Sequence, residues 1–279
     1  MTQARVGISG WVYPAWRGTF YPKGLGQKRE LEYASRHLSS IEINGSFYSL
    51  QRPSSFQRWH DETPDGFVFS VKGPRFITHM KKLADAEVPL ANFFASGVLA
   101  LGDKLGPLLW QLPPTLGFDE ERLATFFERL PRTTSAAARL AEQHDDKIPE
   151  DRALTTASVD QPLRHCLEVR HPSLATERAL QVMRDHDVAI VIADTAGKWP
   201  MVEELTSDFA YARLHGADEL YVSGYTAAAL DRWANKVRGW VDSGRDVYVY
   251  FDNDAKVHSP YDAQALMQRL GIKRPADLD

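Results

Sequence analysis

Side chains that could carry acid/base chemistry stand at the ends of short apolar runs in this sequence. Glu42 and Glu168 could act as general acid and base if burial raised the pKa of one while an arginine kept the other ionised. His215 could shuttle a proton near neutral pH. The candidate catalytic residues are therefore Glu42, Glu168, Asp194 and His215.

Cations and amides at the same kind of position could hold the substrate. Lys72, Arg170 and Arg213 suit an anionic group, because an ammonium or guanidinium binds phosphate or carboxylate. The polar candidates for substrate binding are Asn44, Lys72, Gln111, Arg170, His171, Arg213 and Asn253. Glycosidic, phosphoester and enolisation chemistry all fit these residues, so we expect an anionic carbohydrate-, nucleotide- or phosphate-containing substrate.

Aromatic residues crowd the segment after the first apolar run. Trp11 and Trp16 stand there, and Tyr48 follows the second run. Aromatic faces beside polar groups suit sugars or nucleobases, so these three rings are further candidates for substrate binding. The alternative is a hydrophobic plug, since large aromatic residues are usually buried.

Other readings of the same residues stay open. Glu42, Glu168, Asp194 and His215 could instead ligate a divalent metal in a hydrolase or isomerase. Three cations among the same polar residues oppose this, and no H-E-x-x-H motif is present, so we predict no cofactor. The site could also bind sugar or nucleic acid without catalysis, or form a buried ionic ring with no ligand.

Eight short apolar runs must position these side chains. The predicted strands are Val6–Gly10, Ser40–Asn44, Phe67–Lys72, Leu108–Gln111, His165–Val169, Val188–Ala193, Phe209–Leu214 and Val247–Phe251. Helical stretches alternate with them, which predicts parallel strands and a single closed (β/α)₈ barrel of TIM type over residues 1–279. An open doubly wound sheet is the rival, but no G-x-G-x-x-G follows the first run. In a barrel, the polar strand ends meet at one face.

Helix-capping patterns and one insertion complete the predicted elements. Asp119 should cap a helix over 120–130, and Ser173 should cap a helix over 174–185 with Glu177 as its capping-box partner. We expect an insertion at about 131–163, between the fourth helix and the fifth strand. It should hold an extra helix at 136–142, followed by an exposed loop over 143–160.

The composition excludes several classes of protein. With 279 residues, 43% hydrophobic and 25% charged, the chain is expected to be globular. Its net charge of −4 excludes nucleic-acid binding over the whole surface and leaves only local binding. We expect no membrane span and no signal peptide, and the lone Cys166 favours a buried thiol in a reducing cytoplasm.

Several motifs together resemble a known family. They include Ile8-Ser9-Gly10-Trp11, Glu42-Ile43-Asn44, Trp110-Gln111-Leu112-Pro113-Pro114, Glu168-Val169-Arg170-His171-Pro172 and Arg213-Leu214-His215-Gly216. In this order they resemble the YecE-like family, domain of unknown function family 72. The resemblance implies a single (β/α)₈ barrel whose motif residues are the polar strand ends, and it implies no settled activity. Asp252-Asn253 departs from the two amides usual in the family, which leaves the charge at that rim open.

Overall fold

The structure, a computed structural model, describes residues 2–275, and eight parallel strands lie within that range. They are β1 (Ala4–Ser9), β2 (Ser40–Ile43), β3 (Val68–Lys72), β4 (Leu105–Gln111), β5 (His165–Glu168), β6 (Val188–Asp194), β7 (Phe209–Leu214) and β8 (Asp246–Phe251). Their order, β1 to β8, closes as a barrel. All eight predicted strands are confirmed, with ends displaced by three residues or fewer.

Helices separate the strands and complete the predicted TIM-type fold. They are α1 (Glu30–His37), α2 (Gly45–Tyr48), α3 (Pro53–Glu62), α4 (Glu87–Ala95), α5 (Glu120–Glu128), α6 (Thr134–Ala141), α7 (Glu177–Asp185), α8 (Ala227–Asp242) and α9 (His258–Leu270). None of the helices in residues 2–275 is long and apolar enough to cross a membrane.

The strands form where runs of apolar residues can be buried on both faces. In β6, the residues from Val188 to Ala193 are all buried, so successive side chains pointing to opposite faces both find apolar surroundings. Cys166 in β5 is likewise fully buried, as its apolar surroundings predicted. Asp194 ends β6 as its least buried residue.

One capping prediction is confirmed and one is wrong. The Asp119 side chain accepts a hydrogen bond from the Arg122 amide at 3.1 Å and so caps α5. Ser173 does not cap α7, which begins at Glu177. It lies instead in a 3₁₀ turn, Pro172–Leu174, whose capping side chain is His171. The Ser173 hydroxyl accepts from the Phe118 amide at 2.7 Å, so a contact distant in sequence replaces the local cap.

The insertion contains the predicted helix, α6. Thr133 caps it by accepting from the Ala136 amide at 3.1 Å. The Thr134 amide donates to the Gln161 carbonyl at 3.0 Å, which ties the two ends of the insertion together. Most of residues 143–160 are exposed or half-buried, as predicted, although Ile148 is buried.

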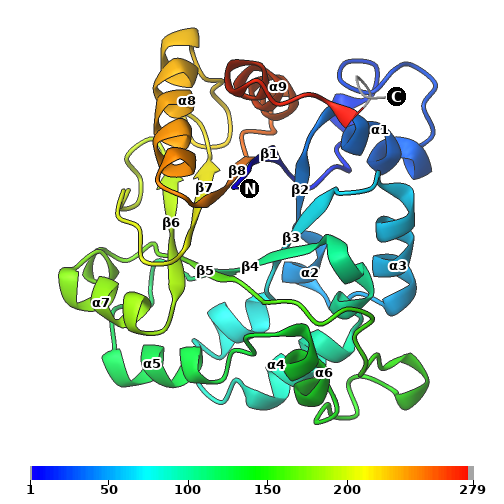
Figure 1. The fold of residues 1–279 in the computed structure, drawn as a ribbon, viewed down its shortest axis with the longest axis vertical. Helices are drawn as coiled ribbons and strands as arrows, with labels where there is room; N and C mark the ends of the chain where they lie inside the picture. The colour runs from blue at the N-terminus through cyan, green and yellow to red at the C-terminus, as the bar shows by residue number, and fades with distance from the viewer. Residues whose placement is uncertain (1, 276–279) are drawn as a thin grey trace. The chain divides into compact units, whose positions relative to one another are not determined.

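The described chain divides into two compact units. The first unit comprises residues 2–42, 63–67 and 189–275, and the second comprises residues 43–62 and 68–188. In the first, α8 packs against α9, and α9 covers β1 (Figure 1). In the second, α4 packs against α6 of the insertion. The single domain over residues 1–279 stays a prediction.

Candidate functional site

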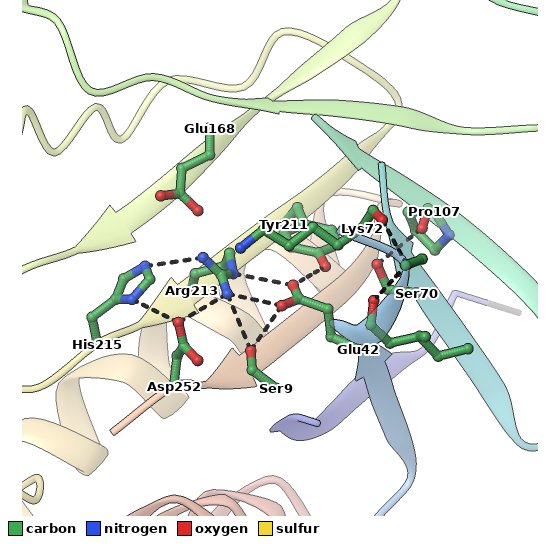
Figure 2. Close-up of polar contacts among 12 residues, drawn as sticks. Ser9, Glu42, Ser70, Lys72, Pro107, Glu168, Tyr211, Arg213, His215 and Asp252 are labelled. Atoms are coloured by element: carbon green, nitrogen blue, oxygen red, sulfur yellow. Dashed lines mark hydrogen bonds and ion pairs between the residues drawn. The ribbon is translucent and has the colours of Figure 1, made fainter. Parts of the chain in front are cut away.

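A buried arginine is the centre of the polar cluster in the first unit. Arg213 donates from Nη2 to Glu42 Oε1 at 2.8 Å and from Nε to Glu42 Oε2 at 3.1 Å. The same Nη2 lies 2.9 Å from Asp252 Oδ2, so the guanidinium lies between two carboxylates (Figure 2). Arg213 and Glu42 are both fully buried. A buried charge is tolerated only when it is paired and hydrogen-bonded in this way.

Both oxygens of Glu42 receive further donors. The Ser9 hydroxyl donates to Oε1 at 2.8 Å, and the Tyr211 hydroxyl donates to Oε2 at 2.6 Å. Each oxygen therefore accepts two hydrogen bonds, one of them from Arg213. This geometry assigns Glu42 a positioning role toward the arginine, and its predicted role in proton transfer stays a prediction.

Strand register explains why these residues meet. Ser9 of β1 pairs directly with Glu42 of β2 in the parallel ladder. In β7, Tyr211 and Arg213 are two residues apart and so project from the same face. His215 continues that alternation after β7, and Asp252 follows the adjacent β8. The cluster thus lies at the carboxyl ends of parallel strands, where barrel enzymes hold their active sites.

His215 is oriented by two members of the cluster. Its Nδ1 lies 3.0 Å from Asp252 Oδ2, and its Nε2 lies 3.4 Å from Arg213 Nη1. The Nε2 contact is longer than a normal hydrogen bond. His215 is fully buried, whereas the Asp252 side chain is 14% exposed.

Tyr13 and Asp254 border the same cluster. The Tyr13 hydroxyl donates to the Ser9 carbonyl at 2.5 Å. Burial raises the pKa of Tyr13, and the Asp252 and Asp254 carboxylates raise it further, so the phenol stays protonated. Burial also raises the pKa of Asp254, with Asp252 adding to the effect. Neither residue is among the candidate site residues predicted from the sequence.

Asp194 lies at the end of β6 in a different environment. Burial raises its pKa, although the Tyr225 hydroxyl donates to its Oδ2 at 3.1 Å and partly opposes that rise. The carboxyl group lines a cavity of about 270 Å³ in the first unit. The His215 amide donates to the Asp194 carbonyl at 2.9 Å, so the two candidate catalytic residues are neighbours on adjacent strands.

Asn253 braces a loop in the first unit. Its Nδ2 donates to the Ser223 carbonyl and to Asp262 Oδ2, both at 2.9 Å. Asp262 also accepts from the Tyr225 amide, and burial raises its pKa. Asn253 is fully buried, and these two hydrogen bonds satisfy its side-chain Nδ2. Its role in substrate binding stays a prediction.

The second unit holds Glu168, Arg170 and Lys72. Arg170 contacts Glu168 Oε1 through both Nε and Nη2 at 2.9 Å. Lys72 is nearly buried, with its Nζ 4.3 Å from the centre of the Phe47 ring. Burial, followed by the nearby Arg170 and Lys72, lowers the pKa of His79 to about 4. His79 therefore adds no charge at neutral pH to a positive environment.

The remaining polar candidates in the second unit differ in exposure. Gln111 is buried, while Asn44 is half-buried with Oδ1 enclosed and without a hydrogen-bond partner. His171 uses Nδ1 to contact the Ser173 hydroxyl at 2.8 Å, so it helps to hold the turn that follows β5. Tyr48 is 72% exposed and open to a ligand.

The first aromatic segment packs largely as a plug. Trp16 is fully buried, stands edge-on to Phe20, and donates from Nε1 to the Asp254 carbonyl at 3.2 Å. Tyr21 is also fully buried and donates to the Trp11 carbonyl at 2.6 Å. Trp11 is half-buried. Of the two tryptophans, Trp11 offers accessible surface, and substrate binding by either ring stays a prediction.

Three members of the Arg213 cluster were not selected from the sequence. Tyr211 precedes Arg213 by two residues, so strand alternation is a signal that could have found it. Ser9 ends β1 and could have been selected in the same way. Asp252 was noted only as a departure from the family pattern, because the sequence does not show that its carboxylate joins Arg213 and His215.

The donor atoms of the alternative metal site are already engaged in other contacts. Within residues 2–275, no three His, Cys, Asp or Glu side chains are grouped so that they could hold a metal ion. In the first unit, the Glu42 oxygens already accept two donors each. A metal there would have to displace Arg213, so the donors present do not fit a resident ion.

Comparison with known proteins gives consistent matches over most of the chain. The family model described as protein of unknown function DUF72 matches residues 5–278. The UPF0759 protein YecE of Escherichia coli (strain K12) is 26% identical over 239 residues, which cover 84% of this chain and 81% of YecE. The UPF0759 protein YunF of Bacillus subtilis (strain 168) is 27% identical over 127 residues, 43% of each chain.

Two solved structures are similar in fold. A DUF72 family protein of Thermotoga maritima superposes with a TM-score of 0.76 at 23% identity, covering 96% of this chain and 99% of that one. A DUF72 family protein of Enterococcus faecalis superposes with a TM-score of 0.74 at 16% identity, covering 97% and 96%. At these identities, the likeness extends to the fold alone.

Proposed function

Because the chain belongs to the DUF72 family, as its motifs predicted, and the family is described as of unknown function, we propose a function from its own residues. The protein is an enzyme that performs metal-independent acid/base chemistry on a small anionic substrate. That substrate contains a carbohydrate, a nucleotide or a phosphate group. The observation that carries this proposal is the 3.0 Å contact between His215 and Asp252 beside Arg213.

In this proposal, Asp252 exchanges a proton with the substrate. The Asp252 side chain is 14% exposed, whereas Arg213, Glu42 and His215 are fully buried. Arg213 and His215 both contact its Oδ2, so they hold the carboxylate in one orientation while the proton moves. Glu42 fixes Arg213, so the charge beside Asp252 stays in place.

Asp194 supplies the complementary acid. Its pKa is raised by burial, so it holds a proton closer to neutral pH than an exposed aspartate does. Asp252 is paired with Arg213, which favours the charged carboxylate. Two carboxyl groups in contrasting environments are the arrangement that assigns one to acid and the other to base.

The second unit, taken by itself, also has clustered cations that suit an anionic ligand. Arg170, Lys72 and Arg75 all lower the pKa of His79, which reports a positive electrostatic environment there. Glu168 is the carboxylate that opposes this effect. Phosphate or carboxylate groups are the ligands that such clustered cations recognise.

The test is a turnover screen on protein treated with EDTA. Sugar phosphates, sugar acids and nucleotides are incubated with the enzyme, and products are followed by ¹H and ³¹P NMR. For any substrate that is turned over, we expect Asp252→Asn and His215→Gln each to lower kcat by about 10²-fold or more. His186→Gln is the control, since that half-buried histidine lies in the other unit and contacts the Val182 carbonyl.

Three results would contradict this proposal. Turnover that EDTA removes and Mn²⁺ restores would favour a metal-dependent enzyme. Saturable binding without turnover would favour the non-catalytic binder. Unchanged kcat in a folded Asp252→Asn protein would leave the Arg213 cluster as a structural ionic ring.

A further inference from the structure

The second unit contains a cavity that the acid/base cluster of the first unit does not explain. Its volume is about 450 Å³, within the range of about 300–1,000 Å³ typical of small-molecule sites. Its walls come from the end of α2, from the segment after β3, from α4 and from the insertion.

The lining of this cavity is mainly apolar. Its apolar side chains include Phe47, Leu50, Phe76, Ile77, Met80 and Pro89. Tyr48 also lines it and is 72% exposed, and Met80 is 66% exposed. Large apolar side chains that are open to solvent beside a cavity are typical of a ligand-binding surface.

The charged groups that line the cavity are of one sign. Among the described lining residues, Arg75 and Lys147 carry charge, and no aspartate or glutamate accompanies them. Lys147 Nζ lies 5.2 Å from the centre of the Phe76 ring and 3.8 Å from Asp145 Oδ2. Asp145 is itself held by the Asn92 amide at 2.9 Å, and it is not part of the lining. The cavity is therefore lined by apolar side chains together with the positive charges of Arg75 and Lys147.

The backbone beside the cavity is unusual. Phe76–Met80 forms a π-helical turn, a geometry found frequently at functional sites. Shortly after it, Lys82, Leu83 and Asp85 all have positive φ, which is uncommon for residues other than glycine. Strain of this kind persists where the surrounding structure requires it and is concentrated at ligand sites.

We propose that this cavity binds a small amphipathic anion, with a flat apolar body against Phe47 and Phe76 and a carboxylate, sulfonate or phosphate group held by Arg75 and Lys147. The apolar lining gains free energy from burying the body of the ligand. The two cations favour an anion over a neutral ligand of the same shape. Lys147 belongs to the insertion, so the proposal gives that segment a role in binding. The site does not depend on the chemistry proposed for the first unit.

The test uses a matched pair of fluorescent probes on the full chain. 8-Anilinonaphthalene-1-sulfonate is a flat aromatic anion, and N-phenyl-1-naphthylamine has the same ring system without the sulfonate. We expect one saturable site for the anion, with Arg75→Gln and Lys147→Gln each raising its Kd about three- to tenfold. Met80→Glu, at an exposed lining position, should abolish binding. The neutral probe should bind more weakly and should not respond to Arg75→Gln.

Lys82→Gln is the control variant. It removes an exposed cation from the same segment at a position outside the lining, so the Kd of the anionic probe should not change. Circular dichroism establishes that each variant is folded. Equal affinity for the two probes, or an unchanged Kd in both Arg75→Gln and Lys147→Gln, would overturn the proposal. An equal loss in Lys82→Gln would do so as well, since it would indicate non-specific attraction by surface charge.

Discussion

The hydroxyl of Tyr211 has a larger energetic role than its position inside a strand indicates. It donates to Glu42 Oε2 at 2.6 Å, where both groups are buried. Hydrogen bonds to a charged acceptor contribute about 1.5–3 kcal/mol, because the acceptor cannot recover its donor from water once it is enclosed. The Arg213 cluster therefore depends on neutral donors as well as on its ion pairs.

We accordingly expect Tyr211→Phe to lower the free energy of unfolding by about 2 kcal/mol. Tyr250→Phe is the matched control, because this tyrosine is also fully buried but shares its hydroxyl with the neutral Ser40 hydroxyl at 2.7 Å. It should cost about 1 kcal/mol. Urea unfolding at pH 7 measures both, and equal losses would show that the charge of Glu42 adds nothing to its bond with Tyr211.

Asp194 should make stability depend on pH in the direction opposite to most carboxylates. Burial raises its folded pKa above the usual 3.8, so the folded state holds this proton more tightly than the unfolded state. The wild type therefore loses stability from this group as pH rises above 3.8 through the folded pKa. Asp194→Asn cannot lose this proton. In urea unfolding, the free energy of unfolding of the variant minus that of the wild type should therefore increase from pH 4 to pH 7.

Asp145→Asn is a control with the opposite sign. The Lys147 amide and the Asn92 side chain lower the pKa of Asp145, so its stabilising contribution is present at pH 7 and is lost as pH falls through the lowered value. The variant should be less stable than the wild type at pH 7 and should approach it in acid. If both variants changed in the same direction with pH, the assigned cause of the Asp194 shift would be wrong.

At the scale of single residues, the sequence selected Glu42, Arg213 and His215 as candidates, because each lies at or just after the end of a strand. It did not identify which residues would pair. Hydrogen-bond and ion-pair partners depend on the register between neighbouring strands, such as Ser9 opposite Glu42, and on contacts between more distant strands. Neither is visible in the periodicity of one strand.

At the scale of the elements, β1 and β2 approach unusually closely at one glycine. A Cβ at Gly7 would lie 1.8 Å from the Ser40 carbonyl oxygen, which belongs to the paired position of β2. Because that neighbour is backbone, it cannot rotate away as a side chain would. The strand pairing that sets Ser9 opposite Glu42 therefore requires glycine at this position.

Gly7→Ala should lower the free energy of unfolding by about 3 kcal/mol. Gly239→Ala, in the last turn of α8 with no atom within 4 Å of the added Cβ, should raise it by about 0.5 kcal/mol. Thermal unfolding of both variants measures the contrast. A Gly7→Ala protein as stable as the wild type would mean that β1 and β2 can separate without cost.

Strands were easier to predict than helix ends in this chain. A strand such as β6 has a continuous apolar run that few other structures can bury, so its place is decided locally. The start of α7 is decided by the 3₁₀ turn Pro172–Leu174 and by the bond from the Phe118 amide to Ser173. That bond joins segments 55 residues apart, so no local pattern could indicate it.

At the scale of the whole molecule, the two units are interleaved along the chain. The backbone passes between them after residues 42, 62, 67 and 188, so neither unit is one continuous segment. Consecutive domains joined by a linker would instead be separated by one exposed boundary. The single domain over residues 1–279 stays a prediction, which a folding experiment can test.

We expect differential scanning calorimetry to give one unfolding peak whose calorimetric and van't Hoff enthalpies agree. The backbone crosses between the two units four times, so we expect them to unfold together. The scan should be made at pH 8. The net charge is −4 at pH 7 and approaches zero near the isoelectric point of about 6.1, where aggregation is favoured. Two resolved peaks would show that the units unfold independently.

The arrangement around Arg213 also limits how such a sequence can evolve. Ser9, Glu42, Arg213 and Asp252 come from four segments of the chain, yet Arg213 donates to each of the other three. Losing any one of them leaves a buried charge or donor behind, so a single substitution is disfavoured even when the final combination would be stable. In homologous chains, Ser9, Glu42 and Arg213 should therefore be kept together.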